Sequence, residues 1–186
     1  MNNNLESKFF IANLLNYKKW IEKGDNLLKV ANSIYPKEYW LKKERQKELS
    51  CFLDCFLMLS SFALENYLKA IIAAKNKDEF KAKMEASEKP ILPKKLKGHD
   101  LQELAKTAGL GESFTEEQLE VLHKLRFYAI YAGRYHVSTN SENLSLGQII
   151  FNDNQNVGLC LGFHSKNDMK IIESIIFILK NNEVLK

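Results

Sequence analysis

The chain has 186 residues, 45% of them hydrophobic, which is enough apolar material for the core of one domain. It contains only eight glycines and three prolines, so the composition argues against a β-sandwich, a barrel or a disordered chain and favours long helices. The net charge of +4 is mild, and because most basic residues are lysines it permits an anionic partner without requiring one.

The first part of the chain predicts two long helices. Apolar residues recur at helical spacing from Leu5 to Ile34, which predicts one amphipathic helix, weakened at Gly24. The stretch from Lys37 to Ala74 contains neither glycine nor proline and becomes almost wholly apolar after its first third. It predicts a single helix that is buried on most sides and forms the spine of a bundle.

The apolar part of this spine, from Leu49 to Ala74, is long enough to cross a bilayer. It carries Asp54, Glu65 and Lys69, and charges at membrane depth are costly, so we expect a core helix and no membrane contact. The N-terminal sequence MNNNLESKFF does not have the basic, apolar and small-residue regions of a signal peptide. We therefore expect a cytoplasmic protein with reduced cysteines.

Shorter helices are predicted next. One helix is expected near Asp78 to Ala86, followed by a mobile, lysine-rich connection up to Lys97. The sequence Gly98-His99-Asp100 then opens a short helix that Gly109 closes as a C-cap, and His99 is expected to cap it or to reach into a cleft. Thr115 and Gln118 form a capping box at the start of a helix that runs to about Gly133.

The last part predicts a change of structure and then a return to helix. Short apolar runs at Gln148 to Phe151 and Val157 to Phe163 flank an Asn-rich segment, which indicates a β-hairpin. Ser165 with Asp168 caps a final isoleucine-rich helix. The predicted fold is mainly α: one domain over residues 1–186, an up-and-down bundle of four to five helices with a small hairpin insertion at about 137–163.

A line of polar residues runs along the apolar spine helix. Asp54, Ser61, Glu65 and Lys69 follow one another at steps of seven, four and four positions, so they share one stripe. One interpretation is a narrow solvent-facing strip with a Glu65–Lys69 pair. The other is a groove or dimer interface where Asp54 and Glu65 meet basic partners, because a lone buried carboxylate is unfavourable.

The segment from Arg126 to His136 is the second candidate site. It holds two of the three arginines, and guanidinium groups bind phosphate or carboxylate and stack on aromatic rings such as Tyr135. Histidine is the side chain suited to proton transfer near neutral pH, so His136 could donate or accept a proton. The alternative is that Arg134 pairs with Glu65 or Asp54 and closes the end of the bundle.

Metal and cofactor sites are not expected. Cys51 and Cys55 lie four residues apart on the apolar helix and are expected to pack in the core, and the four histidines are isolated in the sequence. The glycine-rich and zinc-binding motifs of P-loop enzymes, Rossmann dehydrogenases and zincins are absent from the sequence.

Three motifs occur in a characteristic order. They are A-L-E-N-Y-L-K-A from Ala63 to Ala70, G-H-D-L-Q-E-L-A from Gly98 to Ala105, and A-G-R-Y-H from Ala132 to His136. The series resembles the HEPN-like helical proteins of prokaryotes, over about Leu49 to His136. The resemblance implies a helical bundle that pairs into a homodimer and handles RNA or nucleotides, frequently in toxin–antitoxin or phage-defence settings.

Active HEPN ribonucleases carry an R-x(4–6)-H motif, in which the resemblance implies that Arg binds phosphate and His acts in acid/base cleavage. This chain departs from that motif, because nine residues separate Arg126 from His136 and one separates Arg134 from His136.

Three functions follow from the sequence as hypotheses. The first is a dimer that binds a nucleotide, RNA or a protein partner through a site formed by Arg134, Tyr135, His136, Glu65, Lys69 and His99. The second is a metal-independent endoribonuclease in which His136 is the acid/base and Arg126 or Arg134 holds the phosphate. The third is a non-catalytic interaction module whose polar line is closed by pairs within the chain.

Overall fold

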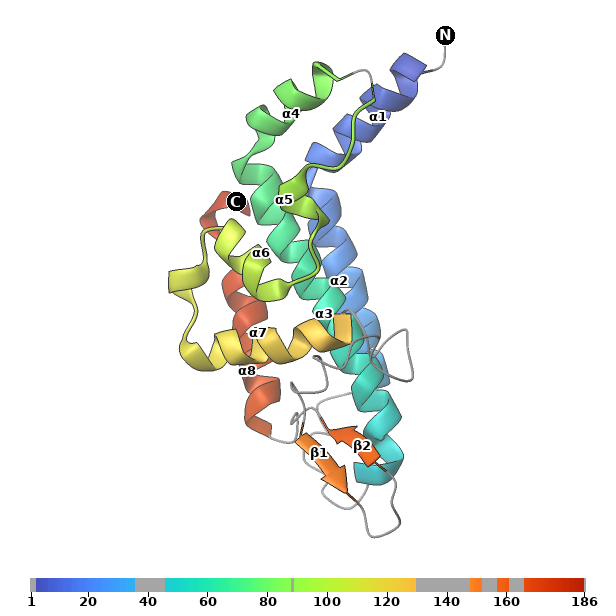
Figure 1. The fold of residues 1–186 in the computed structure, drawn as a ribbon, viewed down its shortest axis with the longest axis vertical. Helices are drawn as coiled ribbons and strands as arrows, with labels where there is room; N and C mark the ends of the chain where they lie inside the picture. The colour runs from blue at the N-terminus through green and yellow to red at the C-terminus, as the bar shows by residue number, and fades with distance from the viewer. Residues whose placement is uncertain are drawn as a thin grey trace.

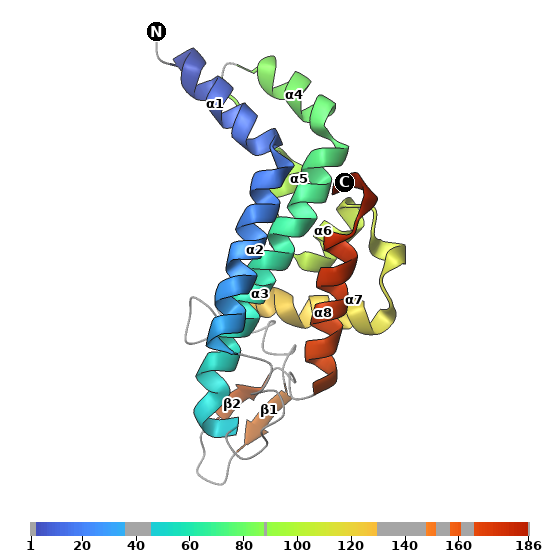
Figure 2. The same ribbon diagram turned by 180° about the vertical axis from the view of Figure 1, so that it is seen from behind.

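A computed structural model describes residues 3–35, 46–87, 89–129, 148–151, 157–160 and 166–185. Over these residues the fold is mainly α-helical, as the sequence predicts, with eight α-helices and two short strands (Figures 1 and 2). The bundle is built on three long helices, α2 (Tyr17–Ile34), α3 (Gln46–Lys75) and α8 (Lys166–Lys180), which lie roughly along the long axis of the molecule.

The helices α2 and α3 form an antiparallel pair and pack closely at Gly24. A Cβ atom at Gly24 would lie 3.0 Å from two ring atoms of Tyr67 and 3.2 Å from the carbonyl oxygen of Ala63. The sequence predicts a weak point in the helix at Gly24. In the structure α2 runs without a break through Gly24, which is buried against α3. The small size of Gly24 lets the two backbones approach.

The predicted single helix from Leu5 to Ile34 is wrong, because the chain breaks at Asn16. The helix α1 (Asn3–Leu15) ends there and α2 begins at Tyr17. Asn16 leaves the helical conformation at φ −81° and ψ 84°, and asparagine readily leaves helices because its side chain competes for backbone hydrogen bonds. The indole Nε1 of Trp20 donates to the carbonyl oxygen of Leu14 across the break, at 2.9 Å.

At one end of the molecule α1 lies against α4 (Lys77–Glu85), which continues from α3 after Asn76. The predicted helix near Asp78 to Ala86 is thus confirmed. The expected mobile connection contains one helical turn, α5 (Lys94–Lys97), and the side chain of Leu96 is completely buried. Burying one leucine stabilises this turn by about 1.5–3 kcal/mol, so the segment is anchored to the core.

The helices α6 (Leu101–Thr107) and α7 (Glu116–Phe127) pack on one side of α3 (Figure 1). In an up-and-down bundle α7 would run alongside α3, but here α7 crosses α3 at a large angle. A 3-10 turn, Gly111–Ser113, lies between them. The predicted ends are confirmed: Gly109 has φ +71°, and Thr115 and Gln118 form the capping box.

After α7 the described chain resumes with β1 (Gln148–Phe151) and β2 (Val157–Cys160). These strands pair antiparallel, with Ile149 opposite Leu159 and Ile150 opposite Gly158. The helix α8 then runs in the same direction as α3 and ends before a 3-10 turn, Glu183–Leu185. Its buried apolar side chains join the core that centres on α3: Met169, Ile172, Ile175 and Leu179.

A hydrogen-bonded chain connects the three long helices. The phenol of Tyr67 on α3 donates to Asp25 Oδ1 on α2 at 2.7 Å, and Lys180 Nζ on α8 donates to the same oxygen at 2.6 Å. Burial and the bond to Asp25 raise the pKa of Tyr67, so the phenol remains a donor. Burial alone would raise the pKa of Asp25, but the bonds from Lys180 and Tyr67 outweigh it and the pKa of Asp25 is lowered.

This lowered pKa predicts an acid-sensitive contribution to stability. The unfolded chain binds the proton of Asp25 more tightly than the folded chain, so the contribution is present above the ordinary carboxyl pKa and is lost as pH falls through the lowered value. The Asp25 and Lys180 side chains are partly exposed, so we expect less than about 1 kcal/mol. Urea unfolding between about pH 6 and pH 3 checks this, because the stability difference between wild type and Asp25→Asn should shrink toward acid. A constant difference would contradict it.

One described stretch, Phe52–Lys75 in α3, is long and apolar enough to cross a membrane by length and composition. Within its most apolar window, 72% of the residues are buried inside the chain. The same burial is found in the core helix of a globular protein, which is the role that α3 has in this fold.

Candidate functional site

Glu65 and Lys69 lie on the side of α3 that faces α6, and both are buried, with 8% and 5% of their surface exposed. The Lys69 ammonium donates to Glu65 Oε1 at 2.7 Å, which confirms the predicted pair. Ser61, one turn earlier, is completely buried, and its Oγ lies 2.9 Å from the carbonyl oxygen of Leu125 on α7. The predicted solvent-facing strip is therefore wrong here: α6 and α7 cover this part of the stripe.

The loop before α6 brings His99 to the same carboxylate. His99 Nδ1 lies 2.9 Å from Glu65 Oε2, so the two oxygens of Glu65 serve two different partners. The expectation that His99 caps α6 is wrong, because Asp100 is the cap. Asp100 Oδ1 accepts hydrogen bonds from the backbone N–H groups of Gln102 and Glu103. Aspartate is favoured at this position because its carboxylate satisfies free N–H groups of the first turn.

Asp100 also reaches α7. Its second oxygen, Oδ2, lies 3.1 Å from Arg126 Nη1 in the last turn of that helix. The loop residues His99 and Asp100 therefore connect α3 to α7. His99 contacts a carboxylate on α3, and Asp100 contacts a guanidinium on α7. Asp100 was not among the site residues expected from the sequence. Its partner Arg126 could not be found from spacing, because 25 residues separate the two.

The side chains of this cluster differ in their exposure. Those of His99 and Arg126 remain 51% and 33% exposed, whereas those of Lys69 and Glu65 are only 6% and 11% exposed. The carboxylates of Glu65 and Asp100 thus hold the imidazole of His99 and the guanidinium of Arg126 at the surface. A Nδ1–H donated to Glu65 leaves Nε2 of His99 directed elsewhere, and Arg126 has further N–H donors beyond the one on Asp100. The arrangement can present hydrogen-bond donors to an anion.

Asp54 does not join this cluster. It precedes Glu65 by 11 residues on the same helix, which corresponds to about 16 Å along the axis. Burial raises the pKa of the Asp54 carboxyl, and a hydrogen bond with Tyr128 partly opposes that rise. Asp54 therefore has a partner within the chain at the end of α7. The expected core position of Cys55, its neighbour, is wrong, because Cys55 is exposed.

Three expected site residues, Arg134, Tyr135 and His136, lie outside the described residues, as does the side chain of Cys51. The last described residue before them is Ala129. In the described part of the chain, no three side chains of His, Cys, Asp and Glu come together in a way that could hold a metal ion. Three pockets lined by described residues include neither Glu65 nor His99, and one of them lies between α1 and α4.

Comparisons with known proteins give no match: no family model, no curated protein and no solved structure is similar to the chain.

Proposed function

We propose that this protein is a HEPN-like, homodimeric helical domain that binds RNA or a nucleotide through phosphate, in a toxin–antitoxin or phage-defence setting. The observation that carries the proposal is the contact between two of its three motifs: Glu65 of A-L-E-N-Y-L-K-A binds His99 of G-H-D-L at 2.9 Å. The adjacent Asp100 holds Arg126 on the helix that leads toward the third motif, A-G-R-Y-H.

The chemistry of the cluster supports an anionic ligand. Arginine binds phosphate in a bidentate way, and a guanidinium that is already oriented by a carboxylate loses less freedom when it does so. The half-exposed His99 is next to Asp100 in the chain, and Arg134 and Tyr135 follow within ten residues of Arg126. In this proposal Arg126 and Arg134 hold phosphate, and Tyr135 stacks on a base.

The test is a titration of fluorescein-labelled single-stranded RNA, with unlabelled nucleotides as competitors. Wild type is compared with Arg126→Ala, Arg134→Ala and Lys29→Ala, the last being an exposed lysine on α2. We expect each arginine variant to bind at least about tenfold more weakly, which is 1.4 kcal/mol, and Lys29→Ala to bind as wild type does. Equal binding by all four proteins, or no binding by any, would leave the interaction module as the better description.

The endoribonuclease remains a second candidate because a carboxylate orients His99. Glu65 is buried and bonds Nδ1, an arrangement that fixes the tautomer of a general base and leaves Nε2 for the reaction. Cleavage with the RNA 2′-hydroxyl as nucleophile needs no metal, so it predicts products with 2′,3′-cyclic phosphate ends in EDTA. His99→Ala and His136→Ala should each be assayed, and intact RNA with all proteins would remove this candidate.

A further inference from the structure

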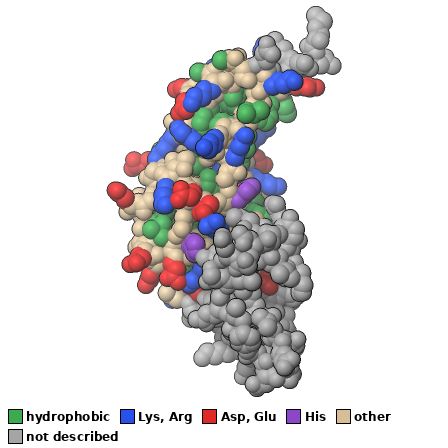
Figure 3. Space-filling view, in the orientation of Figure 1, with side chains coloured by type: hydrophobic (Ala, Val, Ile, Leu, Met, Phe, Trp, Pro, Cys, Tyr) green, Lys and Arg blue, Asp and Glu red, His purple; other side chains and the backbone are tan. Residues whose placement is uncertain are grey.

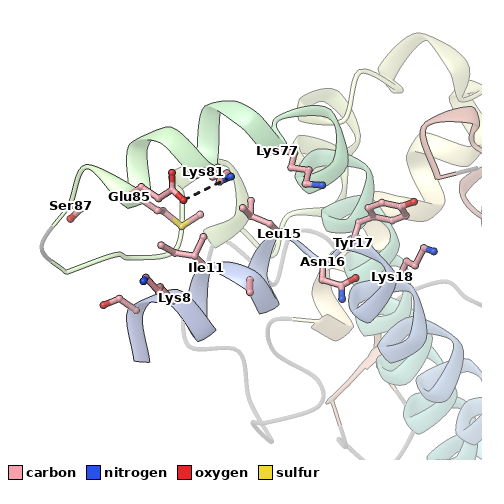
Figure 4. Close-up of a pocket in the computed structure, with 13 residues that line it drawn as sticks. Lys8, Ile11, Leu15, Asn16, Tyr17, Lys18, Lys77, Lys81, Glu85 and Ser87 are labelled. Atoms are coloured by element: carbon pink, nitrogen blue, oxygen red, sulfur yellow. Dashed lines mark ion pairs between the residues drawn. The ribbon is translucent and has the colours of Figure 1, made fainter. Parts of the chain in front are cut away.

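A cleft of about 930 Å³ lies between α1 and α4, at the end of the molecule opposite the two strands (Figures 1 and 4). The two helices run in opposite directions, and the lining follows α1 from Ser7 to Leu15 and continues past the break to Lys18 on α2. The part on α1 corresponds to about 12 Å along the helix axis, or just over two helical turns. The cleft has no contact with Glu65, His99 or Arg126.

The walls of the cleft are strongly basic. Lys8 comes from α1, Lys18 comes from the first turn of α2, Lys77 and Lys81 come from α4, and Glu85 is the only acidic residue in the lining (Figure 4). Lys81 is 4.0 Å from Glu85. In the part of the chain that the structure describes, the other three lysines have no ion-pair partner. Lysines also gather more widely here, and Figure 3 shows basic side chains around α4 and α5 on one face. The cleft is therefore complementary to an acidic ligand.

The floor of the cleft is apolar. Ile11 and Leu15 lie one turn apart on α1 and face Met84 on α4. On α1 the apolar surface continues outward, because helical geometry places Leu5 and Phe9 beside Ala12 at the rim. Leu5 and Phe9 are 75% and 70% exposed, which is unusual for such large apolar side chains. An apolar floor with an exposed apolar edge indicates an interaction surface.

We propose that this cleft binds an amphipathic helix of a partner protein whose flanks are rich in glutamate or aspartate. A symmetric contact with the same cleft of a second copy is disfavoured, because it would bring four more lysines against these four. A flat lipid surface would meet the lysines but not the floor between them. A helix with one apolar stripe reaches the floor and places carboxylates beside both lysine walls, which is the helix-in-groove mode of recognition.

The test uses the full chain and a fluorescent peptide of about 18 residues, long enough to form helix, with leucines at i, i+3 and i+7 and glutamates on both flanks. Fluorescence anisotropy is measured at low and high salt. Lys77→Glu/Lys81→Glu alters one wall and Lys8→Glu/Lys18→Glu the other. Lys23→Glu/Lys29→Glu is the matched control, with the same charge change at exposed positions of α2. Arg126→Ala separates this site from the proposed RNA site.

We expect the peptide to bind wild type, the control and Arg126→Ala alike, and each wall variant at least tenfold more weakly, with affinity falling at high salt. A version of the peptide with lysines in place of glutamates should not bind. The proposal is overturned if wild type does not bind the acidic peptide, or if the wall and control variants bind equally. The same variants are tested with vesicles of anionic lipid, with the fatty acid oleate and for self-association of the chain. The proposal is also overturned if one of these, and not the acidic peptide, binds in a way that the wall variants weaken.

Discussion

Replacing Glu65 with leucine is expected to lower the free energy of unfolding by about 3–5 kcal/mol, the largest effect of any single change considered for this protein. The substitution removes the carboxylate that accepts from Lys69 at 2.7 Å, and Lys69 is 5% exposed. The ammonium then stays buried without a counter-charge, because leucine cannot accept a hydrogen bond. Urea unfolding followed by circular dichroism measures the change.

The chain contains a close control for this prediction. Glu79 on α4 also accepts from a lysine four residues later at 2.7 Å, from Lys83, and from a second cation, Lys95, at 3.1 Å. These side chains are substantially exposed, so Glu79→Leu should lower stability far less than Glu65→Leu does. Adding Lys69→Met to Glu65→Leu should recover most of the loss, since it removes the unpaired charge. A double variant as unstable as Glu65→Leu alone would show that burial of Lys69 is not the cause.

Replacing Gly24 with leucine is expected to lower stability by about 1–3 kcal/mol and to disturb the packing of α2 on α3. At a solvent-exposed position in a helix the same change would be favourable, because the helix propensity of leucine is better than that of glycine by about 0.8 kcal/mol. The sign reverses at Gly24 because a Cβ atom there meets the Tyr67 ring at 3.0 Å and the Ala63 carbonyl oxygen at 3.2 Å.

Gly98→Leu is the matched comparison, because nothing lies within 4 Å of a Cβ atom at Gly98. Its effect should stay within about 0.5 kcal/mol, as for most surface changes. Near-ultraviolet circular dichroism of the tyrosines gives a second measurement, because displacement of Tyr67 alters its surroundings. If Gly24→Leu is as stable as wild type, the two helices can separate without loss and the close approach is not a constraint.

The sequence predicted helix ends well where residues within one turn of the end determine it. The Thr115–Gln118 capping box and the Gly109 C-cap both depend on residues within one turn, and both were predicted. The break at Asn16 was missed, because the apolar pattern continues on both sides of it. The anchoring of Leu96 was missed because its burial depends on distant parts of the chain.

The candidate site was predictable only in part. The spacing of Glu65 and Lys69 was enough to predict their pair, because i and i+4 positions meet on any helix. The contacts of His99 with Glu65 and of Asp100 with Arg126 depend on how α6 and α7 pack on α3. No local pattern encodes that packing. The stripe was placed correctly on one face of α3, but the covering of that face could not be inferred from the stripe itself.

The bond from Lys180 to Asp25 has a consequence for the order of folding. These residues are 155 positions apart in sequence, whereas α2 and α3 are neighbours along the chain. Closing a long loop is entropically costly, so local helix pairs form early and distant contacts form late. We therefore expect α8 to join the bundle after α2 and α3 have paired. During synthesis the α2–α3 pair would then keep one apolar side uncovered until α8, a helix of 15 residues, has been made and packs on it.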